Sequence, residues 1–157
     1  MDLKRFAIIA FASGLFFGSV VGLAAASEQS VVLATVHQFI DGLNRSDVKS
    51  LVAACASPAS IIDDFPPHTW QGPTACGDWA HAFDAANKRY KITDGIVTLA
   101  TPWHVDVTGD RAYVVAPATY TYKQNGKPVR ESGSILTVAL KRVGGSWRMT
   151  GWAWAQH

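Results

Sequence analysis

Residues 36–67 read VHQFIDGLNRSDVKSLVAACASPASIIDDFPP, and the order of elements in this stretch decides the fold. Apolar residues recur at helical spacing up to its first turn signal, which predicts an amphipathic helix over residues 30–43. The apolar face of this helix holds Val32, Val36, Phe39, Ile40 and Leu43. Asn44 suits the left-handed conformation that commonly ends a helix, so the helix is predicted to end there.

A shorter second helix and a strand follow. Ser46 or Asp47 is a suitable N-cap, and Pro58 is predicted to stop the helix. Its apolar stripe holds Val48, Leu51, Val52 and Cys55. The segment SIIDDF, residues 60–65, predicts a short strand, because it is rich in β-branched residues and is followed by two prolines.

The remainder of the chain predicts one more helix and then a sheet. The third helix begins near Pro73 and carries on one side Cys76, Trp79, Phe83, Ala86 and Tyr90. Four strands follow, with turn signals at residues 108–110, 125–126 and 144–145. Three helices before an antiparallel sheet indicate an α+β fold. The sheet is expected to roll around the apolar helix faces and to leave a cavity for a small ligand.

Three segments resemble the nuclear transport factor 2-like (NTF2-like), or SnoaL-like, domain superfamily. They are the opening stretch, VDVTGDRAYVVAPATYTY at residues 105–122, and GGSWRM at residues 144–149. The resemblance runs from Glu28 to His157. It implies a cone-shaped α+β roll, with three N-terminal helices packed on a curved antiparallel sheet. It does not specify function, because this fold hosts many activities.

The resemblance allows one activity of the superfamily to be tested residue by residue. Steroid isomerases carry their general-base Asp at the end of the first strand, where this chain has Asp63. Their oxyanion-hole Tyr corresponds to Phe39, and residues 134–140, SILTVAL, lack the second donor's carboxyl group. Because such donors supply a large part of the catalytic effect, steroid isomerase activity is rejected.

The N-terminus indicates export. Residues 1–26 combine a basic head, an uncharged stretch and Ala24-Ala25-Ala26, which predicts a signal peptide cleaved before a domain at residues 27–157. A retained membrane anchor is the alternative. Cleavage predicts a periplasmic or secreted protein with no stable membrane association.

Charge and cysteine content restrict the partners. The sequence has 14 Lys and Arg and 12 Asp and Glu; removing residues 1–26 takes away Lys4, Arg5 and Asp2, which leaves a net charge of about +1. A domain this close to neutral is not expected to bind nucleic acid. Cys55 and Cys76 are predicted to form a disulfide, since both lie on apolar helix stripes of an exported domain. No metal site or cofactor is predicted, because the histidines have no ligand spacing.

Candidate site residues surround the predicted mouth of the cone. Asp63 and His68 are the candidate catalytic residues, and the two neighbours Asp63 and Asp64 are expected to face opposite ways on a strand. Asp63 is either a solvated strand end or an inward carboxyl whose pKa is raised by loss of hydration. The candidate ligand-binding residues are Trp70, Trp103, Tyr120 and Tyr122. For the tyrosines, ordinary packing against a helix is the alternative.

Three functions stay open. The first is binding of a small, largely apolar ligand without established catalysis. The second is an acid–base enzyme of the cyclase, dehydratase or isomerase type, built on Asp63. The third is an interaction domain that uses its outer sheet face.

The last strand bears on the third function. The resemblance implies that Trp147 and Met149 face inward, and period two then sends Trp152 and Trp154 to the outer face, as the interface of a symmetric homodimer. A bulge at Gly151 would reverse the two faces and place both Trp in the pocket.

Overall fold

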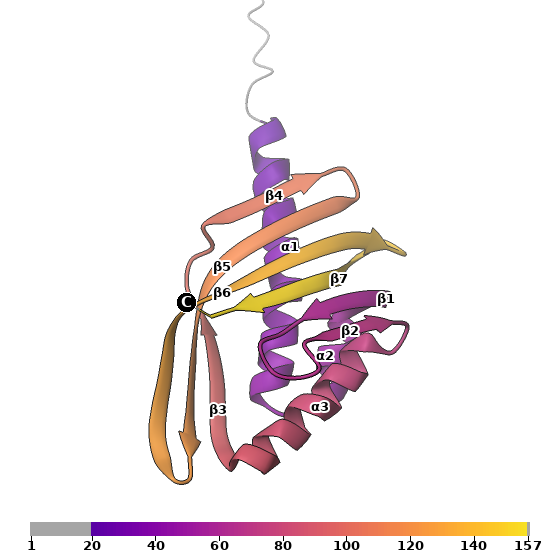
Figure 1. Ribbon diagram of the computed structural model, residues 1–157. Coiled ribbons are helices and arrows are strands. Elements are labelled where there is room, and N and C mark those ends of the chain that lie inside the picture. Colours follow the sequence, from indigo (N-terminus) through magenta and orange to yellow (C-terminus); the bar gives the residue numbers. More distant parts are fainter. Residues whose placement is uncertain (1–19, 157) are drawn as a thin grey trace, which may run out of the picture.

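The computed structural model describes residues 20–156, in which three helices and seven strands follow one another (Figure 1). The elements are α1 Val20–Asn44, α2 Val48–Ala54, β1 Cys55–Ile62, β2 Thr69–Gly72, α3 Ala75–Tyr90, β3 Ile92–Leu99, β4 His104–Thr108, β5 Arg111–Gln124, β6 Lys127–Val143 and β7 Ser146–Ala155. Residues 1–19 of the predicted signal peptide lie outside the described part of the chain. No helix within residues 20–156 has the length and apolar character needed to cross a bilayer.

The elbow between α1 and α2 brings two helices into close contact. Gly42 makes this possible, because a Cβ atom there would lie 2.7 Å from the main-chain nitrogen of Leu51. Asp47 is the N-cap of α2, as predicted, and accepts a hydrogen bond from the Ser50 N–H at 3.0 Å. The left-handed residue is Ser46, with φ 56°, and not Asn44 as predicted. Helix α1 therefore ends at Asn44, as predicted, but the left-handed residue lies two positions further along the chain.

Asn44 instead connects the end of α1 to the sheet through its side chain. Its side-chain amide donates to the Val97 carbonyl at 2.8 Å, and its side-chain oxygen accepts from the Val97 N–H at 2.8 Å. These two bonds fasten the end of α1 to strand β3.

Strand β1 begins earlier than predicted. Helix α2 ends at Ala54, so Pro58 lies inside β1 and does not stop the helix. Pro58 is tolerated because the pairing between β1 and β7 is irregular between Cys55 and Ser60, where a missing N–H breaks no regular ladder. The strand ends at Ile62, so Asp63 and Asp64 lie beyond it.

The sheet is mixed, and in this respect the antiparallel prediction is wrong. Its strand order is β2-β1-β7-β6-β5-β3, with β4 beside β5. Strand β1 runs parallel to β7, and the other pairs are antiparallel. The predicted turns at residues 108–110, 125–126 and 144–145 connect neighbouring strands. The α+β class and the roll of three helices against a curved sheet are confirmed.

The two longest strands bend, and the bend forms the cone. Ala118 pairs with Ser134 and Thr119 with Ser132, so Gly133 is an extra residue in β6, with φ 88°. The first half of β5 pairs with β4, and its second half pairs with β3. In Figure 1, β3 and the β5–β6 hairpin accordingly turn away from β4 toward the side where α3 lies.

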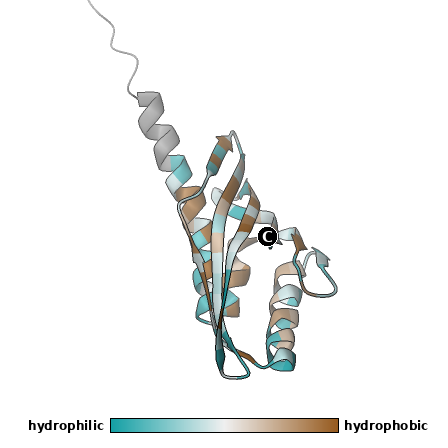
Figure 2. Cartoon of the chain, turned by 60° about the vertical axis from the view of Figure 1, so that its left-hand side comes forward, coloured by the Kyte–Doolittle hydropathy of each residue, from teal (hydrophilic) through white to brown (hydrophobic). Residues whose placement is uncertain are grey.

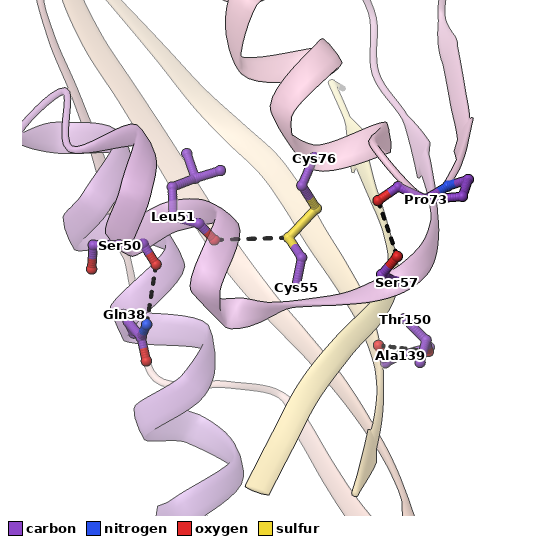
Figure 3. The surroundings of a disulfide bond; sticks show 9 residues. All are labelled: Gln38, Ser50, Leu51, Cys55, Ser57, Pro73, Cys76, Ala139 and Thr150. Carbon is purple, nitrogen blue, oxygen red and sulfur yellow. Dashed lines mark hydrogen bonds between the residues drawn. A yellow bond between two sulfur atoms is a disulfide. The ribbon is translucent and has the colours of Figure 1, made fainter. Parts of the chain in front are cut away.

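A second bulge lies in β7 and reverses the predicted side-chain pattern. Ala139 pairs with Gly151 and Leu140 with Met149, so Thr150 is the extra residue, and its hydroxyl donates to the Ala139 carbonyl at 3.2 Å (Figure 3). Gly151 fits here because a Cβ would lie 2.9 Å from the Ser60 carbonyl of β1. Residues on both sides of the bulge therefore face inward.

The predicted outward orientation of Trp152 and Trp154 is consequently wrong. Trp147 and Met149 are buried, as predicted, but Trp152 is only 5% exposed and Trp154 is half-buried against the same core. The alternative, a bulge near Gly151 that turns both Trp inward, is what the structure shows.

The core lies between the helices and the concave face of the sheet. Hydrophobic and hydrophilic bands alternate along the strands, as expected for a sheet with one face covered (Figure 2). At α1 the core is filled by side chains that are at most 1% exposed: Val32, Val36, Val114, Val138, Leu140 and Met149.

A disulfide links Cys55 to Cys76, as predicted (Figure 3). It joins the start of β1 to the first turn of α3. Next to it, the Ser57 hydroxyl donates to the Pro73 carbonyl at 3.1 Å. Helix α3 is thus fixed at its N-terminal end, from which it reaches across the open end of the cone.

Candidate functional site

A cavity of about 140 Å³ lies between α1, α3 and the bent part of the sheet. Twenty residues line it, and nine of them are aromatic. Phe39, Trp79 and Trp152 are buried at its floor, whereas Asp64, Tyr90 and Gln156 are exposed and form its rim. The predicted cavity is therefore present, at the end of the cone where α3 covers the sheet.

Asp63 is a buried carboxyl in the cavity wall, with 7% of its surface exposed. The Trp79 indole N–H donates to its Oδ2 at 2.7 Å, and the Asp64 N–H donates to its Oδ1 at 2.8 Å. Burial raises the pKa of Asp63 to about 7; the two donors oppose this shift, and the Asp64 carboxyl adds to it. Near neutral pH this group can both accept and donate a proton.

The turn after β1 aims Asp63 at the cavity. The Asp63 N–H donates to the His68 carbonyl at 3.0 Å, and the His68 N–H donates to the Phe65 carbonyl at 2.9 Å. The His68 ring lies 3.1 Å from the Asp63 carbonyl through Nδ1. The exposed His68 side chain lines no part of the cavity, so it braces the turn rather than facing a ligand.

The expectation that Asp63 and Asp64 face opposite ways is wrong, since both line the cavity. Strand alternation applies only up to Ile62, where β1 ends. Asp63 is buried in the wall and Asp64 lies at the rim, so the two carboxyls stand at different depths of one site.

Tyr120 and Tyr122 share one sheet face, as predicted, and both line the cavity, with ring centroids 4.7 Å apart. The Tyr122 hydroxyl donates to Glu131 at 2.7 Å, and the Gln156 amide donates to the other oxygen of Glu131. Burial and this bond raise the pKa of Tyr122 to about 12. Glu131 had no signal in the sequence, because only the pairing of β5 with β6 brings it beside the tyrosines.

Two buried donors at the cavity lack hydrogen bonds of ordinary geometry within residues 20–156. They are the Tyr120 hydroxyl and the Trp152 indole N–H, and both are shielded from solvent. Burial, followed by the charge of Glu131, raises the pKa of Tyr120 to about 12, and the Asn87 side chain opposes the shift. The Tyr120 hydroxyl packs against Gly95, where a Cβ would lie 2.6 Å away. Trp152 packs edge-on against Trp79 at 4.8 Å.

The other two candidate ligand-binding residues lie outside the cavity lining. Trp70 is 8% exposed and packs against Phe65, with ring centroids 5.0 Å apart, so it supports the wall from behind. Trp103 is 67% exposed and precedes β4. The aromatic face of α3, with Trp79, Phe83 and Tyr90, supplies the wall instead, and its helical spacing was visible in the sequence.

Cysteine, histidine and carboxylate side chains in residues 20–156 form no group of three that is placed to hold a metal ion. The cavity therefore offers aromatic surface, a buried carboxyl and a polar rim.

Solved structures with the same architecture are similar in fold at low sequence identity. Hexachlorocyclohexane dehydrochlorinase LinA-type3 from Novosphingobium barchaimii has a TM-score of 0.73 at 12% identity, over 87% of this chain and 90% of that one. An NTF2-like protein with a cystatin-like fold from Novosphingobium aromaticivorans has a TM-score of 0.70 at 14% identity, over 89% and 91%. A ketosteroid isomerase-like protein from Erwinia carotovora has a TM-score of 0.65 at 15% identity, over 82% and 95%.

The family of the chain follows from its sequence, although no curated protein sequence matches the chain significantly. A model of the SnoaL-like domain family matches residues 32–153, which include the opening stretch, most of the cavity lining and most of the last strand. The chain belongs to the SnoaL-like domain family, within the NTF2-like fold.

Proposed function

We propose that this domain binds a small, largely apolar molecule in the cavity. The observation that carries the proposal is the cavity of about 140 Å³ with nine aromatic residues in its lining. Ligand sites are typically concave and apolar, with a few polar groups that fix orientation. An apolar cavity of roughly 150 Å³ accommodates one benzene molecule, so a ligand with one or two rings suits this space.

A panel of one- and two-ring compounds tests the proposal through the thermal unfolding midpoint, Tm. A ligand at roughly 100 times its Kd adds about 2.7 kcal/mol, which raises Tm by roughly 10 °C in a domain of this size. Ala86→Leu fills the cavity and should abolish the shift, because Ala86 lines it. Ala85→Leu, on the exposed side of the same helix, should leave the shift intact. A panel without any effect on wild-type Tm contradicts the proposal.

Acid–base chemistry at Asp63 is the second candidate function. A carboxyl in the cavity wall with a pKa of about 7 favours it, because a general base works best with a pKa near the operating pH. A dehydrochlorinase and a ketosteroid isomerase-like protein share the fold, which makes proton abstraction from a C–H bond the reaction class to examine. In the described lining no cationic side chain accompanies Asp63, so the developing charge would have to be stabilised by neutral donors, of which the Tyr120 hydroxyl and the Trp152 indole N–H are the candidates.

Solvent exchange tests Asp63 without a known substrate. The ring ketone 2-tetralone has an acidic C–H, and NMR measures deuterium incorporation in D₂O. We expect the wild type to accelerate exchange and Asp63→Asn to lose the acceleration while it still binds the ketone. Equal exchange rates for the two proteins exclude Asp63 as the base.

Export is part of the same proposal. The disulfide supports it, because such bonds persist mainly in oxidising compartments. Mass spectrometry of the protein from its native cell should find an N-terminus at Ser27. A chain that retains residues 1–26 contradicts cleavage.

We still propose a homodimer, but with a different interface, because Trp152 and Trp154 face inward. The outer sheet face exposes Ile62 at 56%, Ile96 at 43% and Tyr113 at 44%. A second copy of the chain packed on this face would cover these side chains. Sedimentation velocity should detect a dimer that Tyr113→Ser weakens, and a wild-type monomer at tens of micromolar, on the order of a weak Kd, contradicts it.

A further inference from the structure

The charged side chains in the cavity lining are all acidic. They are Asp63 in the wall, Asp64 at the rim and Glu131 on β6. Within the described chain, the lining contains no Lys, Arg or His. Asp64 and Glu131 both contribute to the raised pKa of Tyr122, so their fields converge on one part of the mouth.

In the part of the chain that the structure describes, most other acidic side chains form ion pairs, and these three carboxyls do not. Among residues 20–156, Glu28, Asp84 and Asp94 form ion pairs with Arg142, Lys88 and Lys123, whereas the cavity acids have no cationic partner. Glu131 accepts hydrogen bonds from Tyr122 and Gln156, which are neutral donors. The negative charge at the mouth is therefore stabilised by hydrogen bonds but not neutralised.

The walls of the cavity attract the same sign of charge. Ring faces of Trp, Tyr and Phe are electron-rich and bind cations, more strongly where water is excluded. Phe65, Phe83 and Trp154 line the same cavity as the three acidic side chains. Aromatic faces and carboxylates together form a site for an ammonium group, which each of them alone holds only weakly.

A separate observation shows that the lining is incomplete. Trp152 lines the cavity with 5% of its surface exposed, and its indole N–H has no hydrogen-bond partner within residues 20–156. A buried donor without a partner is costly, and the electron-rich face of a bound aromatic ring would accept from it once the covering rings shift.

We infer that the cavity takes a small amine whose apolar ring packs against the floor formed by Phe39, Trp79 and Trp152 and whose ammonium group lies at Asp64 and Glu131. The inference rests on the proposed function and names its ligand class. An apolar body fits the floor, and a positive head group neutralises the charge at the mouth.

Three probes with one body and different head groups test the charge preference. 2-Phenylethylamine is a cation at pH 7.5, 2-phenylethanol is neutral and 3-phenylpropionate is an anion. Titration calorimetry at low salt should give a Kd for the amine about tenfold below that of the alcohol, and the carboxylate should bind more weakly than either. Salt should weaken the amine and leave the alcohol unchanged.

Matched variants separate the charge from the cavity. Glu131→Gln and Asp64→Asn should each raise the Kd of the amine by about three- to tenfold and leave that of the alcohol unchanged. Asp84→Asn, an exposed acid on the outer side of α3, is the control and should change neither Kd.

The outcomes distinguish the two levels of the proposal. Equal binding of the three probes, or preference for the alcohol or the carboxylate, overturns the amine inference and leaves apolar binding standing. Binding of none of the three overturns the amine inference, and the wider apolar panel then decides the proposed function separately.

Discussion

The two ends of the concave sheet face bury different kinds of residue. Beneath α1, branched and unbranched aliphatic side chains such as Val114, Val138 and Leu140 are at most 1% exposed. At the other end, below α3, rings of Phe39, Trp79 and Trp152 form the floor of a cavity of about 140 Å³. One sheet thus carries a filled end and a hollow end.

The difference shows how the domain divides its tasks. Aliphatic side chains interdigitate to crystal-like density, so the filled end supplies stability. The hollow end holds the buried carboxyl of Asp63 and the unpartnered donors of Tyr120 and Trp152, each of which reduces stability. Groups that oppose folding gather where a ligand site is proposed.

Replacing one buried leucine at each end tests the contrast between the two ends, and this is the largest effect that we expect. Leu140→Ala at the filled end should destabilise the domain by about 4 kcal/mol, because a closed void remains. Leu136 is equally buried but already borders the cavity, so Leu136→Ala should cost about 2–3 kcal/mol, in the lower part of the same range. Urea unfolding measures both. Equal losses would mean that the cavity end is as tightly packed as the other.

The disulfide should stabilise the hollow end more than the filled end. Replacing Cys55 and Cys76 together by Ala should reduce the free energy of unfolding by about 3 kcal/mol on the chain-entropy account. Hydrogen exchange should rise more in α3, which the bond fixes to β1, than in β5 and β6. Uniform acceleration along the chain would show that the bond stabilises the whole domain without favouring α3.

Asp63 should give the hollow end a pH dependence of stability. Its pKa is about 7 in the folded protein and 3.8 ordinarily, so the folded state retains a proton that the unfolded chain has released. Stability from this group is therefore greatest at low pH and falls as pH rises from about 4 to about 7.

The variant Asp63→Asn isolates this contribution, because an amide oxygen still accepts from Trp79. The difference in unfolding free energy between variant and wild type should grow in favour of the variant from pH 4 to pH 7 and then level off. Asp84→Asn should show no such trend over the same range. A pH-independent difference for Asp63→Asn would mean that the carboxyl is well hydrated.

The sequence predicted the filled end better than the hollow one. Helical spacing identified Val32 and Val36 as buried, because this signal depends on neighbouring residues. The orientation of Trp152 depends on one extra residue, Thr150, whose presence in a bulge is decided by pairing with β6. Local periodicity cannot detect that choice.

The candidate site shows the same limit. Asp63 was identified by its place at a strand end, and Tyr120 and Tyr122 by alternation. Trp103 and His68 were named from their loop positions and lie outside the lining. Glu131 was missed because it reaches the mouth only through the register of β6 against β5, a contact between residues distant in sequence.

The smallest expected effect comes from a pair of hydroxyl groups in the hollow end. Tyr120→Phe removes a buried hydroxyl without a hydrogen-bond partner within residues 20–156, so stability should stay level or rise by about 1 kcal/mol. Tyr122→Phe removes the donor to Glu131 and should cost about 1 kcal/mol, since a charge-assisted bond is lost at a partly exposed site. The two variants delete the same atom from neighbouring positions of one strand face, so their difference in urea midpoint reports hydrogen bonding and not ring packing. If Tyr120→Phe destabilises as much as Tyr122→Phe, the Tyr120 hydroxyl is bonded in solution, either to the Asn87 side chain or to a cavity water. In the second case an apolar ligand would have to displace that water in order to bind.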